Sequence, residues 1–184
     1  VDIEAFGNVG IPARTGRFTV GTVKSNEYTY GIDVLIRAFA MARGRSLSPE
    51  QWRLVIVGRG SKQREYQQLA TDLGLADEVE FRGAVPHHDV PSHLAEFDVF
   101  AALSREESFG VAVVEAMAAG IPCVVSDVGG LPEVVGSSGI VVASDDVPAA
   151  AAAISKLHAD VTLRADFRAE GSRRAREPFG QSAC

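Results

Sequence analysis

The segment Ser104–Pro122, which reads SREESFGVAVVEAMAAGIP, carries the residue types best suited to chemistry in this chain. An apolar run follows Gly110, and its pattern predicts a helix over Val111–Ala119. The first amide groups of a helix have no partner within it and lie at the positive end of its dipole. They therefore favour an anion such as phosphate. Gly110 has no side chain and would let the backbone approach that anion closely.

Two carboxylates flank this predicted anion site: Glu107 precedes the helix, and Glu115 lies eight residues further on. Neither would bind phosphate, but each could accept hydrogen bonds from the hydroxyl groups of a sugar. Glu115 stands among small apolar residues, where a charged side chain needs a partner. An anion site between two hydroxyl acceptors fits a nucleotide sugar. The alternative is that both residues are acids placed favourably near a helix N-terminus.

Other residues give weaker signals for chemistry. His87 and His88 stand before Asp89, but no Cys or further His has metal-ligand spacing, so we expect turn or surface histidines and no metal site. Gly58–Gly60 matches half of a dinucleotide-binding fingerprint but follows the second predicted strand, and no P-loop sequence is present. Three arginines near the end of the last helix predict a solvated basic face, with contact to an acidic membrane surface as the lesser alternative: Arg173, Arg174 and Arg176.

Short apolar strands alternate with longer helical patterns along the chain. The strands are continuous apolar runs, which is typical of a sheet covered on both faces. We therefore predict an α/β fold: a Rossmann-like, doubly wound parallel sheet with helices on both faces. The predicted strands are Phe18–Val23, Leu54–Val57, Val79–Phe81, Val99–Leu103, Pro122–Val125 and Ile140–Val142. The predicted helices are Tyr30–Ala42, Gln63–Leu73, Val90–Glu96, Val111–Ala119, Pro148–His158 and Val161–Glu177.

The length and composition fit one globular domain. The chain has 184 residues, of which 46% are hydrophobic and 23% are charged, and its formal net charge is -6. A nucleic-acid-binding surface normally shows a basic excess, so we expect no nucleic-acid partner. Cys123 lies in an apolar run and Cys184 is the last residue, so the cysteines form no disulfide framework and favour a reducing cytoplasm.

The two ends of the chain predict its boundaries. No signal peptide or membrane-spanning run is visible in the sequence, and because it begins without Met we expect a processed, cut or partial chain. We assign residues 1–16 to an interdomain linker, 17–177 to a nucleotide-sugar-binding domain and 178–184 to a loose C-terminal tail.

The run from Glu107 to Pro122 resembles the E-x7-E signature of retaining glycosyltransferases of the GT-B architecture, particularly glycosyltransferase family four. The resemblance covers nearly the whole chain, in order and with suitable spacing. Further segments similar to the family are Val1–Phe6, which looks like the entry to the second domain, Tyr30–Phe39 (first helix), Val57–Gly60, Phe81–Pro86 and Asp127–Glu133 (turns and loops after strands).

The resemblance implies a role for each matching residue. Glu107 would be the catalytic residue that contacts hydroxyl groups of the donor sugar, and Glu115 would hold the nucleotide ribose. Arg82 and Gly83 would lie beside the nucleobase; the alternative for Arg82 is an ordinary surface charge next to a turn glycine. The donor sugar and phosphate would also meet the start of the helix, namely Ser108, Phe109, Gly110 and Val111.

One departure from the family pattern concerns the donor diphosphate. The family usually carries an arginine and a lysine that neutralise it, and this chain has Thr22 and Tyr30 at those positions. Lys24, in the same loop, and Lys62, after Gly60, are the candidates to replace them. The alternative for either is an ordinary solvated lysine.

The resemblance implies the donor-binding half of a retaining glycosyltransferase. It would bind a UDP-sugar or a GDP-sugar without a metal or other cofactor, and it would be inactive without the missing N-terminal domain that holds the acceptor. The longer enzyme would be cytoplasmic or peripheral to the inner face of the membrane, with membrane contact only through parts absent from this sequence. The alternatives are a non-catalytic nucleotide-binding or interaction module of the same fold and half of a nucleotide-sugar epimerase.

Overall fold

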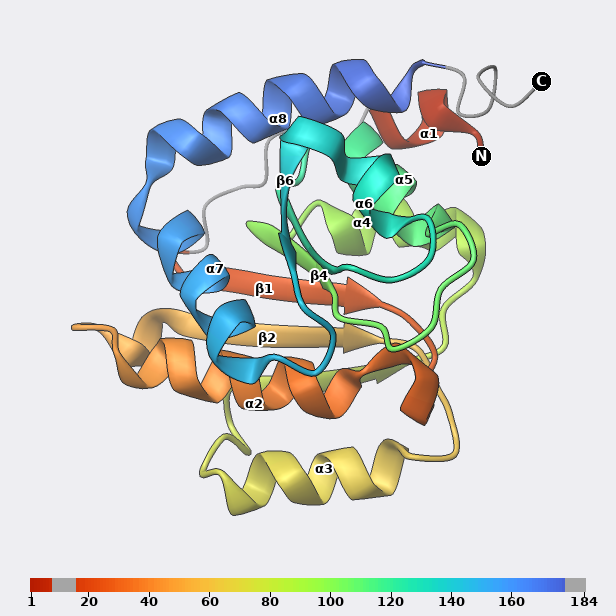
Figure 1. Cartoon of the computed structure of the whole chain (residues 1–184). Coiled ribbons are helices and arrows are strands. Elements are labelled where there is room, and N and C mark those ends of the chain that lie inside the picture. The colour runs from red at the N-terminus through yellow and green to blue at the C-terminus, as the bar shows by residue number, and fades with distance from the viewer. Residues whose placement is uncertain (8–15, 178–184) are drawn as a thin grey trace.

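A computed structural model of the chain describes residues 1–7 and 16–177. Its centre is a six-stranded sheet in the order β3-β2-β1-β4-β5-β6, in which all neighbouring strands are parallel (Figure 1). The predicted fold class is therefore confirmed. The strands are β1 (Phe18–Val23), β2 (Trp52–Val57), β3 (Val79–Gly83), β4 (Val99–Ala102), β5 (Cys123–Ser126) and β6 (Gly139–Val142).

Helices cover both faces of this sheet (Figure 1). One layer consists of α2 (Ile32–Gly44), α3 (Gln63–Asp72) and α7 (Val147–Ala159). The other layer consists of α1 (Ile3–Gly7), α4 (Val90–Leu94), α5 (Val111–Ala118) and α6 (Leu131–Val135). The last helix, α8 (Val161–Ala175), runs from α7 to α5, with Leu163 packed in the first layer and Ala175 in the second.

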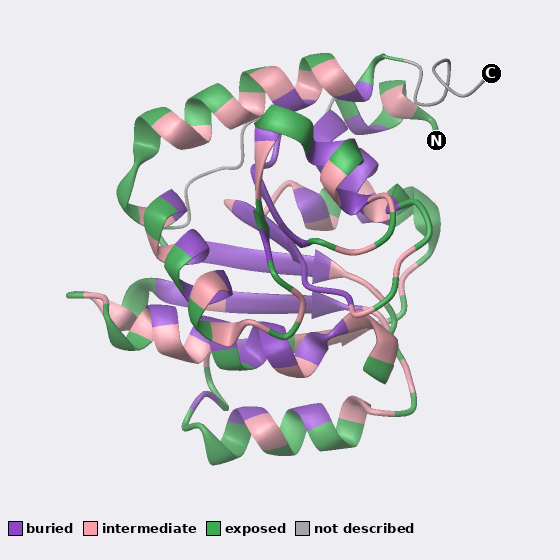
Figure 2. Ribbon diagram, viewed as in Figure 1, coloured by how far each residue is buried: buried purple, intermediate pink, exposed green. Residues whose placement is uncertain are grey.

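The strands feed two hydrophobic cores because successive side chains point to opposite faces of a sheet. In β2, Leu54 and Ile56 belong to the core beneath α2, while Val55 and Val57 belong to the core beneath α5. The four central strands, β2, β1, β4 and β5, are consequently buried almost throughout, whereas the edge strands β3 and β6 are mostly half-buried (Figure 2). Cys123, in β5, is fully buried as expected, and burial raises the pKa of its thiol.

The strand order reverses between β1 and β4. From β1 the chain continues through β2 to β3 on one side, and from β4 through β5 to β6 on the other. In open α/β sheets the loops diverge at such a switch point and leave a crevice at the carboxyl ends of the strands, where ligands bind. The loops that follow β1 and β4 are therefore the first places to look for a site.

Two regions differ from the sequence-based expectations. Part of the predicted linker is ordered: Ile3–Gly7 forms α1, and Phe6 is 1% exposed in the core beneath α5. The rest of that linker between residues 8 and 15, and the predicted tail, lie outside the described residues. Arg174 does not lie on a solvated face, because its Nε donates to Val134 O at 2.9 Å and it caps the end of α6.

No helix within residues 1–7 and 16–177 combines the length and the apolar character that crossing a membrane requires.

Candidate functional site

Lys24 and Glu107 meet at the switch point of the sheet. Lys24 directly follows β1, and Glu107 lies in the loop between β4 and α5. The Lys24 Nζ donates to Glu107 Oε2, and both side chains are only 12% exposed. Because β1 and β4 are hydrogen-bonded neighbours, residues 83 positions apart in the sequence become direct partners. The structure thus brings together two of the predicted site residues.

Tyr30 lies beneath the same lysine. It ends the short 3-10 helix η1 (Tyr28–Tyr30), and Lys24 Nζ lies 4.7 Å from the centroid of its ring. A cation over an aromatic face gains electrostatic stabilisation. Lys62, the other candidate cation, instead pairs with Glu65 at the start of α3. Of the two lysines, Lys24 is the one that contacts Glu107.

The N-terminus of α5 opens beside this ion pair. Its N-cap is Gly110 with φ of 83°, a left-handed conformation that favours glycine, and no side chain caps the helix. By contrast, Asp146 caps α7 and Asp160 caps α8 through side-chain oxygens. The helix start therefore keeps its positive end available for an anion.

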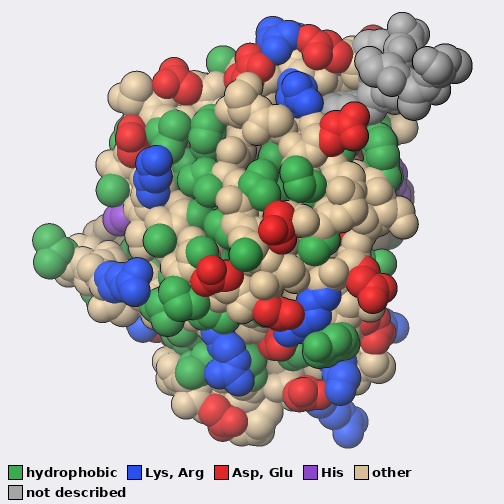
Figure 3. All heavy atoms as spheres, in the orientation of Figure 1, with side chains coloured by type: hydrophobic (Ala, Val, Ile, Leu, Met, Phe, Trp, Pro, Cys, Tyr) green, Lys and Arg blue, Asp and Glu red, His purple; other side chains and the backbone are tan. Residues whose placement is uncertain are grey.

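The residues on either side of Gly110 are exposed at the start of α5. Phe109 is 43% exposed and Val111 is 47% exposed, and Ser108 is also exposed. Acidic and basic side chains lie close together at the lower right-hand side of Figure 3, the side toward which the strand arrows of Figure 1 point. The start of α5 is thus exposed, and charged side chains lie on the side of the molecule toward which the strands point.

A glycine in the loop between β5 and α6 packs closely against the backbone of Glu107. Gly129 has φ of 52°, and a Cβ atom there would come within 1.5 Å of the Glu107 carbonyl oxygen. A side chain at this position would push the β4–α5 loop away, so glycine is required by both conformation and space. This loop belongs to Asp127–Glu133, the segment whose sequence pointed to the neighbourhood of the site.

Glu115 lies on α5 behind the site and is 5% exposed. Its Oε1 is 2.7 Å from Nε2 of His87, which belongs to the 3-10 helix η3 (His87–Asp89) after β3. His87 was expected to be a plain turn residue. Its side chain is indeed 68% exposed, but it is also the partner that the buried carboxylate requires.

Arg82, which was predicted to lie beside the nucleobase, forms ion pairs with two glutamates of this domain. Its guanidinium contacts Glu96 at 2.8 Å and Glu80 at 2.9 Å. Hydrogen bonding to Glu96 and Glu80 outweighs burial and raises the pKa of Arg82. Gly83 ends β3, and its carbonyl oxygen accepts from Gly58 N at 2.8 Å. A base contact at these two residues stays a prediction.

Arg105 was missed by the sequence analysis. Its guanidinium contacts Asp33 at 2.9 Å and Asp145 at 2.8 Å, and it lies 4.0 Å from the Tyr28 ring centroid. Burial acts to raise the pKa of Asp33, but hydrogen bonds and charge from Arg105 outweigh it and lower that pKa. The arginine thereby joins the β4–α5 loop, which carries Glu107, to the first turn of α2 and to the loop between β6 and α7.

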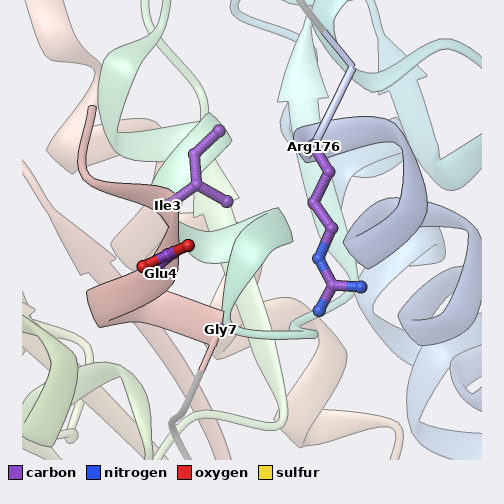
Figure 4. Close-up of a pocket in the computed structure, with 4 residues that line it drawn as sticks. All are labelled: Ile3, Glu4, Gly7 and Arg176. Carbon is purple, nitrogen blue, oxygen red and sulfur yellow. The ribbon is translucent and has the colours of Figure 1, made fainter.

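A hollow of about 460 Å³ lies away from this site, lined by Ile3, Glu4, Gly7 and Arg176 (Figure 4). Gly7 lies near Ala118, which ends α5, whereas the candidate site lies at the beginning of that helix. Within the described ranges, no cluster of three or more His, Cys, Asp or Glu side chains could hold a metal ion.

Comparison with protein families gives a match over most of the chain. Residues 9–174 match the model of the family described as glycosyl transferases group 1. A GDP-mannose-dependent alpha-(1-6)-phosphatidylinositol monomannoside mannosyltransferase of Mycolicibacterium smegmatis is 40% identical over 139 residues, covering 71% of this chain and 36% of that protein. A D-inositol 3-phosphate glycosyltransferase of Stackebrandtia nassauensis is 38% identical over 147 residues, covering 74% and 33%. The chain thus spans about a third of the length of these curated relatives.

Solved structures show the same architecture. The crystal structure of Anabaena HepE in complex with UDP and glucose has a TM-score of 0.82 and 27% identity, covering 95% of this chain and 50% of that one. The C-terminal domain of the group 1 glycosyl transferase LpcC from Francisella tularensis has a TM-score of 0.81, with 95% of both chains covered. At 21% identity, the latter likeness concerns the fold alone.

Proposed function

The chain belongs to the glycosyl transferases group 1 family, and from this premise we propose that it is the donor-binding half of a retaining glycosyltransferase. It binds a nucleoside diphosphate sugar in the crevice above β1 and β4, and a second domain holds the acceptor. The observation that carries this proposal is the meeting of Lys24, Glu107 and the uncapped start of α5 at the switch point of the sheet.

Each part of the donor has a matching group in this arrangement. The amides at the start of α5, at Phe109, Gly110 and Val111, face the diphosphate with the positive end of the helix dipole. Lys24 adds a cation beside them, and Glu107 accepts hydrogen bonds from the sugar hydroxyls. Glu115 accepts hydrogen bonds from the ribose.

The chemistry proposed for these groups is stabilisation of a leaving diphosphate. Negative charge develops on the diphosphate as its bond to the sugar breaks, and preorganised amides and a lysine stabilise that charge. The acceptor attacks from the face that the diphosphate leaves, which retains the anomeric configuration. The proposed reaction needs no metal, since amides and Lys24 supply the positive charge.

The nucleobase is proposed to be uracil or guanine. HepE was solved with UDP, and the mycolicibacterial relative is named as GDP-mannose-dependent. We further propose that the longer enzyme acts in the cytoplasm, or at the inner face of the membrane through parts outside this chain.

Calorimetric titration of the chain with UDP and with GDP tests the proposal. We expect one of the two to bind, and Glu115→Ala to weaken that binding by about 1.5–3 kcal/mol, the range for a hydrogen bond to a charged group. No heat of binding with either nucleotide at millimolar concentration would refute a competent donor site. An unchanged affinity in Glu115→Ala would limit that residue to a structural role.

A further inference from the structure

His87 and Glu115 come from different elements, η3 and α5, but contact each other directly. Glu115 is the fifth residue of α5 and its side chain is 6% exposed. His87 Nε2 lies 2.7 Å from its Oε1, and among the described residues no other hydrogen-bond partner of this carboxylate is found. A buried carboxylate that has one partner owes its orientation to that partner.

The imidazole ring of His87 also packs against an aromatic side chain. Its centroid lies 5.6 Å from the ring centroid of Phe6, with the two planes tilted by 56°. Phe6 is 1% exposed and is fixed in the core beneath α5. His87 therefore has a rigid apolar support on one side and Glu115 on the other, although its side chain is 68% exposed to solvent.

We propose that His87 is a positioning residue that orients the Glu115 carboxylate toward the ribose of the bound nucleotide. The proposal rests on the proposed function and adds a residue to it. An Nε2–H group donates to Oε1 and fixes the plane of the carboxylate, which leaves Oε2 to accept from the neighbouring 2′ and 3′ hydroxyl groups. Through the Phe6 contact, the orientation also depends on α1, the helix that leads into the domain.

The test compares nucleotide affinity in variants of the full chain, with two forms of one nucleotide as probes. The probes are whichever of UDP and GDP binds, and its 2′,3′-dideoxy analogue. We expect His87→Ala to weaken binding of the ribonucleotide by roughly tenfold, the equivalent of one hydrogen bond to a charged group. Binding of the dideoxy analogue is expected to stay within about twofold, because it offers no hydroxyl groups to Glu115.

Two further variants separate positioning from folding. His87→Gln places an amide N–H near the former Nε2 and is expected to restore most of the affinity. His88→Ala is the matched control, because His88 lies on the same 3-10 turn, is 81% exposed and contacts Asp89. We expect it to bind both probes as the unchanged chain does. In His87→Ala combined with Glu115→Ala, the loss should equal that of Glu115→Ala alone.

The outcomes distinguish this inference from the proposed function. If the unchanged chain binds neither UDP nor GDP, the donor site itself is refuted, and the role of His87 with it. If the chain binds but His87→Ala weakens both probes equally, or weakens neither, the positioning role alone is overturned. Independent, additive losses in the double variant would likewise overturn it.

Discussion

Lys24 is held between Glu107 and the face of the Tyr30 ring, at the point where β1 ends. In the family pattern two basic residues neutralise the donor diphosphate, and Thr22 and Tyr30 stand in their places. Thr22 is 1% exposed and Tyr30 serves as the surface beneath the lysine. Lys24 is therefore the residue we expect to carry the missing positive charge.

Replacing Lys24 with methionine removes the charge but keeps most of the side-chain volume. We expect Lys24→Met to weaken binding of the nucleoside diphosphate by about 1.5–3 kcal/mol, the range for a charged hydrogen bond, in a calorimetric titration. Lys62→Met is the matched control and should change the affinity by less than about 0.5 kcal/mol, because its salt bridge with Glu65 is exposed. Equal losses in the two variants would contradict the assignment.

The sequence could predict the residues of the site better than their partners. Glu107, Gly110 and Glu115 share one segment, so a local pattern was enough to select them. Arg105 and His87 act on residues 72 and 28 positions away, and only the topology of the sheet brings those partners together. No local pattern around His87 or Arg105 reports such contacts, so Arg105 was missed and His87 was predicted only as a turn or surface histidine.

At the scale of elements, α7 is docked onto the sheet by an aromatic cluster at its C-terminal end. The ring of His158 lies 4.8 Å from the centroid of Phe18, in β1, and 4.6 Å from that of Trp52, in β2. Burial, and then the charge of Arg164, lower the pKa of His158, while Asp98 acts in the opposite direction. The neutral imidazole is thus the form that suits the folded state.

The sign of the pH effect follows from this lowered pKa. The unfolded chain binds a proton on His158 near pH 6.5, whereas the folded chain binds it only at lower pH, so protonation favours unfolding. We expect the free energy of unfolding from urea titrations to decrease as the pH falls below about 6.5, with one proton involved. In His158→Phe, which keeps an aromatic ring, this part of the pH dependence should disappear.

A control variant isolates the contribution of this histidine from those of other titrating groups. His88→Phe removes a histidine that is 81% exposed and should follow the pH dependence of the unchanged chain. If His158→Phe also follows it, the docking of α7 does not depend on the neutral imidazole.

Long periodic helices and buried strands were predictable because their patterns are local. The predicted helix over Pro148–His158 corresponds to α7, and the predicted strand over Phe18–Val23 is β1 without change. The short helix α4 was predicted within Val90–Glu96, whereas α1 and α6, of five residues each, were not predicted. They form where Phe6 and Leu131 are buried against the rest of the second core, a contact that no short window of sequence reveals.

At the scale of the whole molecule, the alternation of strands and helices predicted the class of fold but not the order of the strands. That order places the loops after β1 and β4 on either side of the switch point, and so creates an edge with donor-binding features. The match to the glycosyl transferases group 1 family covers residues 9–174, yet the chain spans about a third of its curated relatives. Under the proposed function, this site is one wall of a cleft whose other wall is the acceptor-binding domain.

The proposed division between a donor-binding and an acceptor-binding domain leads to a prediction about sugar transfer. Nucleotide binding needs only groups on this chain, whereas transfer also needs an acceptor oriented against the sugar, which supplies much of the rate of a two-substrate reaction. We expect the chain alone to bind nucleotide but to release no UDP or GDP from the corresponding sugar donor above the level of Glu107→Gln. A chain that also contains the proposed acceptor-binding domain should release nucleotide when an acceptor is present. Release by the chain alone that is abolished by Glu107→Gln would show that one domain is sufficient for the chemistry.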